Sequence, residues 1–287
     1  MGKKANPTNG GLRDALAPRA PGNPFEVAER DTHVYGPGDK KWRCATDSRG
    51  YATPGGKTPD ELVIHATDGF IPLWGPNVVL HWRFHEASMG YFENPGAAKE
   101  AIEGMFARGI LAWGDAAPVT FKRTNDVWDF QIRMAHADDC DDGGCVLASA
   151  FFPDGGRHTL DLYPILFKQT EEEIIETFAH EIGHVFGLRH FFAKVSETAW
   201  PSEIFGKHHK FTIMNYGSDS RMTAHDRSDL EGLYTGVWDG IIEGINRTPV
   251  VQVRPYHELR SIRREEAVVM GRSPAIRGGR VVRAGAE

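Results

Sequence analysis

Residues 170–190, TEEEIIETFAHEIGHVFGLRH, contain the pattern that decides the fold. Thr170 and Glu173 are spaced as a capping box, which marks the start of a helix. Apolar residues then recur at helical intervals at positions 174, 175, 178, 182, 185 and 186. Gly187 can adopt the left-handed conformation in which helices often end. The stretch therefore predicts an amphipathic helix that ends in a sharp turn.

The same stretch carries the residues of a metal site. His180 and His184 are four positions apart, so one helical face presents both imidazoles to a single point. The turn at Gly187 brings His190 round as a third ligand. Three neutral imidazoles leave Zn²⁺ one open tetrahedral position, which is the catalytic arrangement. Glu181 lies beside them, where it can take a proton from a zinc-bound water. The alternative is a buried pair of structural histidines on an apolar helix.

Composition and charge limit the class of protein. The 287 residues carry a formal net charge of −6, which argues against a general nucleic-acid binder. No apolar run approaches the roughly 18 residues of a membrane span, and the first 30 residues show no conventional secretory signal. Three cysteines are too few for a disulfide scaffold, although Cys140 and Cys145 are close enough to pair in an oxidising compartment.

Charge divides the chain into three expected parts. Residues 1–60 carry ten Lys and Arg against seven Asp and Glu, and residues 247–287 carry nine Arg against four Glu. Residues 61–246 carry 14 basic and 28 acidic side chains. We expect a flexible N-terminal arm or pro-segment at 1–60, a folded domain at 61–246 and a basic C-terminal tail at 247–287. The tail has room for one short helix around 257–270, and a solvated tail is the simplest interpretation of it.

Periodicity within the acidic part indicates an α+β fold. We expect an alternating strand at 78–85, a helix from the Asn94–Pro95 cap to Pro118, and strands at 130–134, 145–152 and 158–164, followed by the capped helix. The order β-α-β-β-β-α favours a mixed sheet packed against helices.

A family resemblance follows from the helix motif together with Thr212–Gly217, TIMNYG. This combination resembles the metzincin metallopeptidases, in which a methionine-containing turn lies beneath the zinc. The resemblance gives that place to Met214, which composition alone would describe as core filler. Tyr216 is similar to the tyrosine of the astacin and serralysin groups and would stabilise the oxyanion. A half-buried aromatic side chain is the alternative for Tyr216.

Residues 61–235 more specifically resemble matrixins, on the stretches 71–84, 97–121, 129–134, 143–163 and 223–236. The resemblance implies a zincin fold with a twisted mixed sheet, an active-site helix and a C-terminal helical subdomain. It also implies an edge strand at 156–163 that pairs with an extended peptide. The structural zinc of matrixins is not expected, because its histidines would fall at Ser149 and Thr159. The acidic turn Asp138, Asp139, Asp141 and Asp142 with Gly143–Gly144 would bind Ca²⁺ or simply be solvated.

Trp42–Asp47, WRCATD, faintly resembles the prodomain segment that keeps matrixins latent. Cys44 would then ligate the open zinc position, and an ordinary cysteine in the arm is the alternative. The family resemblance points outside the cell and the missing signal points inside, so the location stays open.

The sequence thus predicts a zinc-dependent endopeptidase that acts on protein or peptide substrates and is expected to be a monomer. Its site residues are His180, His184 and His190 for zinc, with Glu181 and Tyr216 catalytic. Two alternatives are a zincin-fold hydrolase with a narrow or non-peptide substrate and a non-catalytic zinc-binding interaction module. Glu181 counts against the module, because binding alone needs no base beside the metal.

Overall fold

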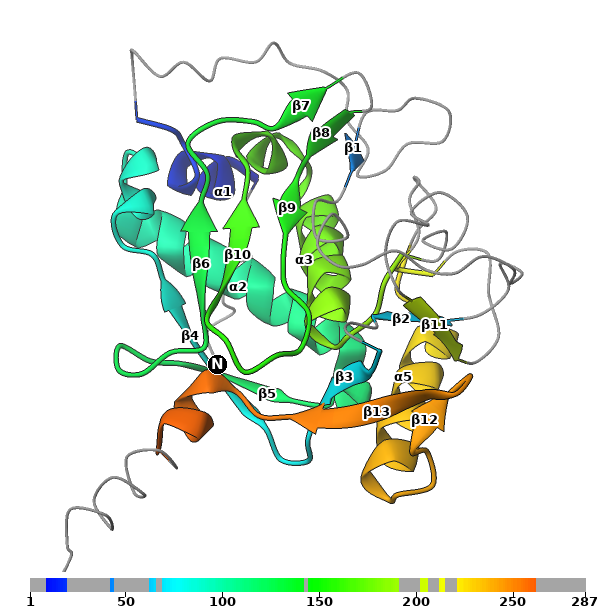
Figure 1. Cartoon of the computed structure of the whole chain (residues 1–287). Coiled ribbons are helices and arrows are strands. Elements are labelled where there is room, and N and C mark those ends of the chain that lie inside the picture. The colour runs from blue at the N-terminus through cyan, green and yellow to red at the C-terminus, as the bar shows by residue number, and fades with distance from the viewer. Residues whose placement is uncertain are drawn as a thin grey trace, which may run out of the picture.

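The computed structural model describes residues 9–19, 42–43, 62–65, 69–141, 144–190, 202–205, 212–214 and 221–261. Its centre is a five-stranded sheet with the strand order β5–β4–β6–β10–β9 (Figure 1). Strands β5, β4, β6 and β10 run parallel, and β9 is antiparallel to β10. The predicted α+β fold with a mixed sheet is therefore confirmed. In chain order the strands are β4 (Val79–Phe84), β5 (Thr120–Arg123), β6 (Phe130–Met134), β9 (Ala148–Ser149) and β10 (His158–Leu162).

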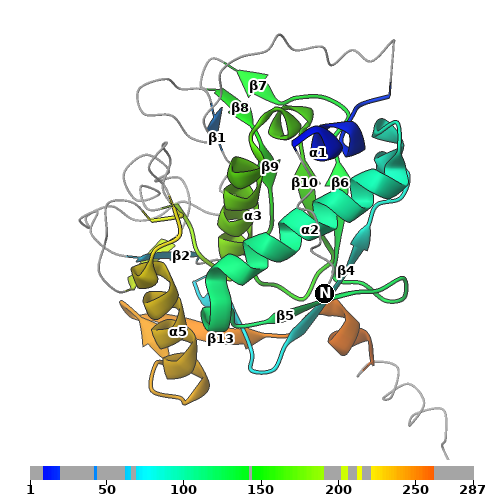
Figure 2. The same ribbon diagram turned by 180° about the vertical axis from the view of Figure 1, so that it is seen from behind.

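Two long helices, α2 (Pro95–Trp113) and α3 (Glu171–Val185), cover one face of this sheet (Figure 2). Alternate residues of β4 are buried, as the period-two pattern predicts. The two helices pack closely at Gly109, where a Cβ would lie 2.7 Å from the Phe178 Cβ and 3.1 Å from the Ala179 N. The core lies between the helices and the sheet.

Helix α2 ends earlier than expected. The Asn94 side chain accepts a hydrogen bond from the Ala97 N–H, as predicted for the cap. The helix stops at Trp113, however, because Gly114 takes a positive φ of 58° and a short 3-10 turn follows. The expected stop at Pro118 was therefore wrong by about one helical turn.

The edge of the sheet also differs from the expectation. The strand expected at 156–163 is β10, which lies between β6 and β9 and is not the edge. The edge is β9, since Asp161 and Leu162 of β10 pair with Ser149 and Ala148. The buried run 145–152 forms two short strands, β8 (Gly144–Val146) and β9, with Leu147 between them.

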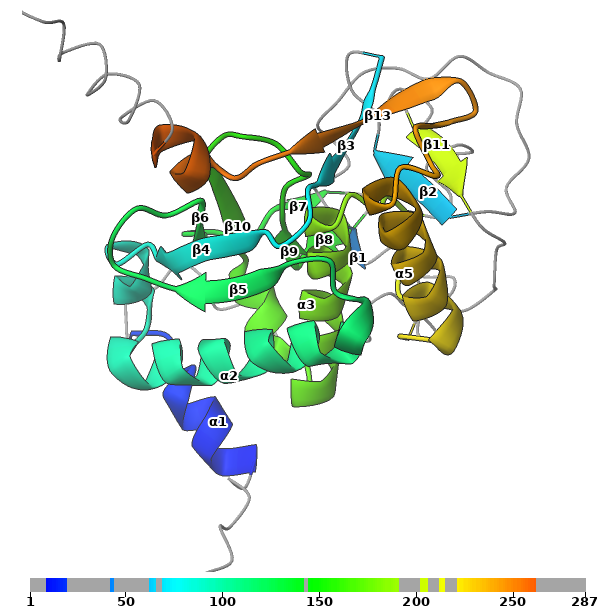
Figure 3. The same cartoon turned by 90° about the horizontal axis from the view of Figure 1, so that it is seen from below.

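The C-terminal part is folded further than the expected boundary at 247. Strand β13 (Thr248–Val253) pairs in parallel with β3 (Ile71–Trp74) and antiparallel with β12 (Gly244–Ile245). A helical segment at 256–261 follows, on the sheet face opposite α2 (Figure 3). These backbone pairings join the residues after 247 to the domain, so the solvated tail does not begin there.

Helix α5 (Ala224–Trp238) begins at a capping box formed by Thr223 and Asp226. Together with the β12–β13 hairpin it makes the C-terminal region, which is therefore mixed rather than purely helical (Figure 1).

The expected N-terminal arm includes a packed segment. Helix α1 (Asn9–Ala15) lies against α2, Leu16 is buried in the core, and the Arg19 N–H donates to the Tyr91 carbonyl. The domain limits at 60 and 247 are therefore too narrow for the described residues.

Short strand pairs complete the structure. One sheet has the order β1–β8–β7, with β1 (Trp42–Arg43) parallel to β8, and β7 (Cys140–Asp141) is joined to β8 by the disulfide Cys140–Cys145. Strands β2 (Leu62–His65) and β11 (Ser202–Phe205) pair antiparallel. None of the described helices is long and apolar enough to cross a bilayer.

Candidate metal centre

Helix α3 presents two of the three predicted ligands. Its first turn has the full capping box, in which Thr170 and Glu173 exchange hydrogen bonds. His180 and His184 follow on the buried face, and neither side chain is exposed. After the helix, Gly187 takes a φ of 92° and the chain turns back, which places His190 beside the other two. The structure thus brings together the three histidines that the sequence singles out.

The three imidazoles fit a single metal ion. One ring nitrogen from each histidine lies within 4.8 Å of the others. His180 Nε2 and His190 Nε2 are 3.0 Å apart. Zinc–nitrogen bonds of about 2.0–2.1 Å in a tetrahedron place two nitrogens about 3.3 Å apart, so this spacing suits zinc.

Backbone carbonyls orient two of the rings. His180 Nδ1 lies 2.7 Å from the Ile213 carbonyl, and His184 Nδ1 lies 2.7 Å from the Leu188 carbonyl. A carbonyl can only accept, so each Nδ1 carries the proton and each Nε2 keeps its lone pair. Metal-binding histidines are typically held in this way.

A turn at 212–214 supports the helix from below. Met214 is buried, and a Cβ on Gly183 would overlap its Sδ and would lie 3.1 Å from the Trp113 ring. Burial raises the pKa of Asp226, although hydrogen bonds from Thr223 and the Ile213 backbone oppose that rise. Through these hydrogen bonds, Asp226 links α5 to the turn that orients His180. The position of Met214 agrees with the family resemblance.

Glu181 is fully buried next to the histidine cluster. Tyr216 and Cys44 lie outside the described residues, so their predicted roles are not tested by the structure.

Three aromatic residues contact the metal-binding helix in a way that no sequence pattern predicts. The Trp74 Nε1 donates to the Val185 carbonyl at 2.7 Å, and the Tyr234 hydroxyl donates to the Phe186 carbonyl at 2.9 Å. These bonds hold the last turn of α3, where free carbonyls otherwise need partners. Phe152 packs edge-on against His184, with ring centroids 5.6 Å apart. Their partners are far apart in sequence, so no spacing pattern reveals them.

The acidic turn is anchored to the protein. Asp138 Oδ1 accepts a hydrogen bond of 2.7 Å from the Ile165 N–H. Burial raises the pKa of Asp138, although this hydrogen bond and nearby Lys168 oppose the rise. Asp142 and Gly143 lie outside the described residues.

Comparison with known proteins shows a similarity to the matrixins. Residues 74–216 match the sequence model of the matrixins. The chain is 32% identical over 104 residues to human stromelysin-3, covering 32% of this chain and 21% of that protein. It is 34% identical over 135 residues to the metalloendoproteinase 4-MMP of Arabidopsis thaliana, covering 42% of this chain and 38% of that protein. The matches thus span about a fifth and about two fifths of these relatives.

Two solved structures are similar at 12% identity. Myroilysin gives a TM-score of 0.39, with 56% of this chain and 95% of that chain covered. High choriolytic enzyme 1, a hatching enzyme zinc-protease from Oryzias latipes, gives 0.33, with 60% and 92% covered. These scores are low, and the sequence match is the stronger comparison. Over residues 74–216 the chain is similar to the matrixins.

Proposed function

We propose that this protein is a zinc-dependent endopeptidase. The observation that carries the proposal is the convergence of His180, His184 and His190, with their ring nitrogens within 4.8 Å of one another. Zinc held by these residues would polarise the scissile carbonyl and lower the pKa of a water molecule toward about 7. The matrixin match over 74–216 supports the same activity.

The chain's own residues would carry the remaining steps. Glu181 is the base that takes a proton from the attacking water and passes it to the leaving amine. Tyr216 is proposed to donate a hydrogen bond to the oxyanion. The edge strand β9, in place of the strand first expected, would align an extended peptide through backbone hydrogen bonds.

Glu181→Ala tests the mechanism. The variant should retain about one zinc per chain by mass spectrometry and lose turnover of an unfolded protein substrate by several orders of magnitude. Glu172→Gln is the matched control, because Glu172 is exposed on the same helix and should leave turnover unchanged. Unchanged turnover in Glu181→Ala would refute the role of the base. Zinc without any cleavage by the wild-type protein would favour the binding module.

The finer features of the prediction are also proposals. We expect protein or peptide substrates, a monomer by light scattering, and no affinity for nucleic acid. Calcium at the acidic turn around Asp138 would raise the melting temperature when Ca²⁺ is added to metal-stripped buffer.

A further inference from the structure

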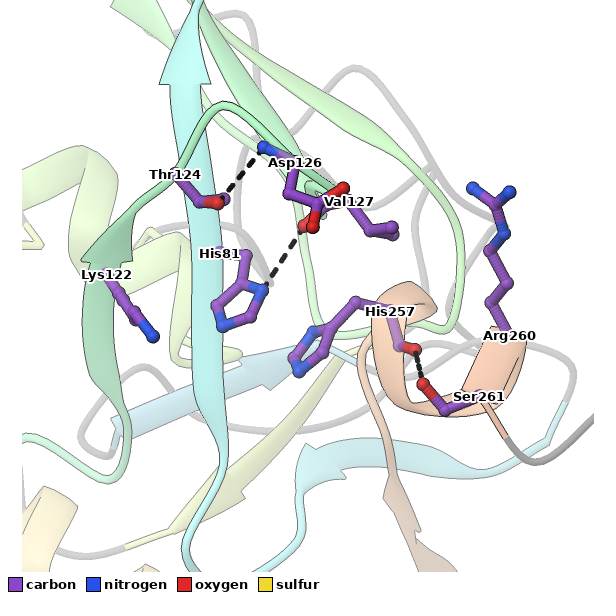
Figure 4. Close-up of a pocket in the computed structure, with 8 residues that line it drawn as sticks. All are labelled: His81, Lys122, Thr124, Asp126, Val127, His257, Arg260 and Ser261. Atoms are coloured by element: carbon purple, nitrogen blue, oxygen red, sulfur yellow. Dashed lines mark hydrogen bonds between the residues drawn. The ribbon is translucent and has the colours of Figure 1, made fainter. Parts of the chain in front are cut away.

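A second cluster of metal-binding residues lies away from the proposed active site. His81 on β4, Asp129 just before β6 and His257 in the 256–261 helical segment bring ligand atoms within 4.8 Å of one another. The cluster borders a pocket of about 450 Å³ (Figure 4). The pocket is lined in part by the 256–261 segment, which lies on the sheet face opposite α2 (Figure 3). His257 belongs to the segment beyond the matrixin match, so the C-terminal extension completes this cluster.

Hydrogen bonds assign the protons on both rings. His81 Nδ1 lies 3.2 Å from the Val127 carbonyl, with its other nitrogen on the opposite edge of the ring (Figure 4). His257 Nδ1 lies 2.8 Å from Asp129 Oδ2. In the neutral rings each Nδ1 therefore donates, and each Nε2 is left with a lone pair. This is the arrangement of His180 and His184 in the first cluster, with Asp129 in place of one carbonyl.

Asp129 is suited to orient a ligand rather than to contact the ion. It is buried, and its two oxygens accept the backbone N–H groups of His81 and His257 at 2.7 and 2.8 Å. A carboxylate that receives the Nδ1–H of a metal-binding histidine strengthens that histidine as a ligand.

We propose that His81 and His257 form a second site for a divalent transition metal, bound through their Nε2 atoms and oriented by Val127 and Asp129. Imidazole ligands suit Zn²⁺, Cu²⁺ and Ni²⁺, and water would complete the coordination. The rings stack with centroids 3.9 Å apart and planes inclined by 17°. An ion bound by both Nε2 atoms would require the stacked rings to tilt apart. His257 has room for this, since 17% of its side chain is exposed.

A substitution at Lys122 distinguishes a site for a metal ion from a site for an anion. It lies directly opposite His81 in the β4–β5 pair and lines the same pocket, as do Arg260 and the acidic Asp126. A lysine ammonium opposes a metal ion and attracts an anion. Lys122→Ala should therefore strengthen the binding of a metal ion, whereas it would weaken the binding of an anion such as inorganic phosphate.

The test is a calorimetric titration of Zn²⁺ into the full-length chain whose first site is already loaded with zinc. We expect one further equivalent to bind. His81→Ala and His257→Ala should each weaken that second event at least tenfold and leave the first zinc in place. His136→Ala is the control, because His136 is exposed and lies outside the cluster. Its titration should match that of the wild type.

Several outcomes would overturn the proposal: no second event, a second event that persists in His81→Ala, or weaker zinc binding in Lys122→Ala. Should either histidine variant fail to fold, Cu²⁺ added to the zinc-loaded wild type provides an independent measurement. Its electron paramagnetic resonance spectrum should show coupling to two imidazole nitrogens. A spectrum without nitrogen coupling would exclude the site. Because these readouts do not depend on cleavage, they stand apart from the proposed peptidase activity.

Discussion

Gly183→Ala tests whether the turn at 212–214 supports the metal-binding helix. An added Cβ would overlap Met214 Sδ and approach Trp113 Cζ2 to 3.1 Å and Met214 Cε to 3.3 Å. Met214 and Trp113 are both buried, so neither has open space to enter. The methionine must therefore move, and with it the Ile213 carbonyl that orients His180.

A matched glycine isolates the steric part of this effect. Alanine favours a helix interior by about 1 kcal/mol relative to glycine. Overpacking a core costs about 1–3 kcal/mol. Gly232 lies within α5 with nothing within 4 Å of its added Cβ, so Gly232→Ala gains the first term without the second. The free energy of unfolding should therefore be about 1–3 kcal/mol lower for Gly183→Ala than for Gly232→Ala.

Urea unfolding of the zinc-free proteins measures this difference, and competition with a chelator measures zinc affinity. Disturbing an orienting hydrogen bond typically weakens metal binding 10- to 100-fold, so Gly183→Ala should bind zinc less tightly and Gly232→Ala should not. If the two variants are equally stable and bind zinc equally, Met214 does not confine the helix and the reasoning fails.

Three further predictions concern the surrounding chain. Replacing Cys140 and Cys145 by serine should lower the free energy of unfolding by about 2 kcal/mol, the loop-closure term for a ring of this size, as measured by urea denaturation; equal stability would contradict it. Strand β1, which ends one residue before Cys44, pairs with β8 near the edge strand. If Cys44 ligates the open zinc position, Cys44→Ala should raise initial cleavage rates; unchanged rates would indicate an ordinary cysteine. Burial raises the pKa of Asp226 above the value of about 3.9 that an aspartate has in the unfolded chain. The protonated carboxyl therefore stabilises the folded state below that pH, and this stability is lost as the pH rises through the folded pKa. The stability of the wild type relative to Asp226→Asn should therefore fall as the pH rises above about 4, with Glu231→Gln, at an exposed position of the same helix, as the matched control.

The metal centre could be predicted because its determinants are local. Two histidines four residues apart share a helical face, and Gly187 marks the turn to the third. The residues that hold this helix could not be found in the same way. Trp74 and Tyr234 reach it from positions 111 and 48 residues away from their acceptors. Contacts over such separations depend on the folded chain and leave no periodic pattern.

Strand order was harder to predict than strand position. The alternation at 158–164 predicts a strand, but it does not say which strand lies on each side. The choice of β10 as the edge failed for that reason. Strand β13 was missed because none of its residues is fully buried and because it contains Pro249, which argues against a strand in a sequence pattern. Its parallel pairing with β3 compensates for that weak pattern.

The β9–β10 edge, where the family resemblance would place a structural zinc, is stabilised by other interactions in this protein. Ser149, at one of the positions where a histidine would be needed, pairs with Asp161 across the β9–β10 edge. The Asp161 carboxylate in turn accepts two hydrogen bonds from Arg133, at 2.7 and 2.8 Å. The Cys140–Cys145 disulfide closes the turn that leads into the same edge. A covalent bond and a bidentate ion pair thus act where the family resemblance would place a metal. A chelator should consequently abolish cleavage while leaving this edge of the sheet protected in amide hydrogen exchange. Loss of that protection on chelation would show that a metal ion holds the segment after all.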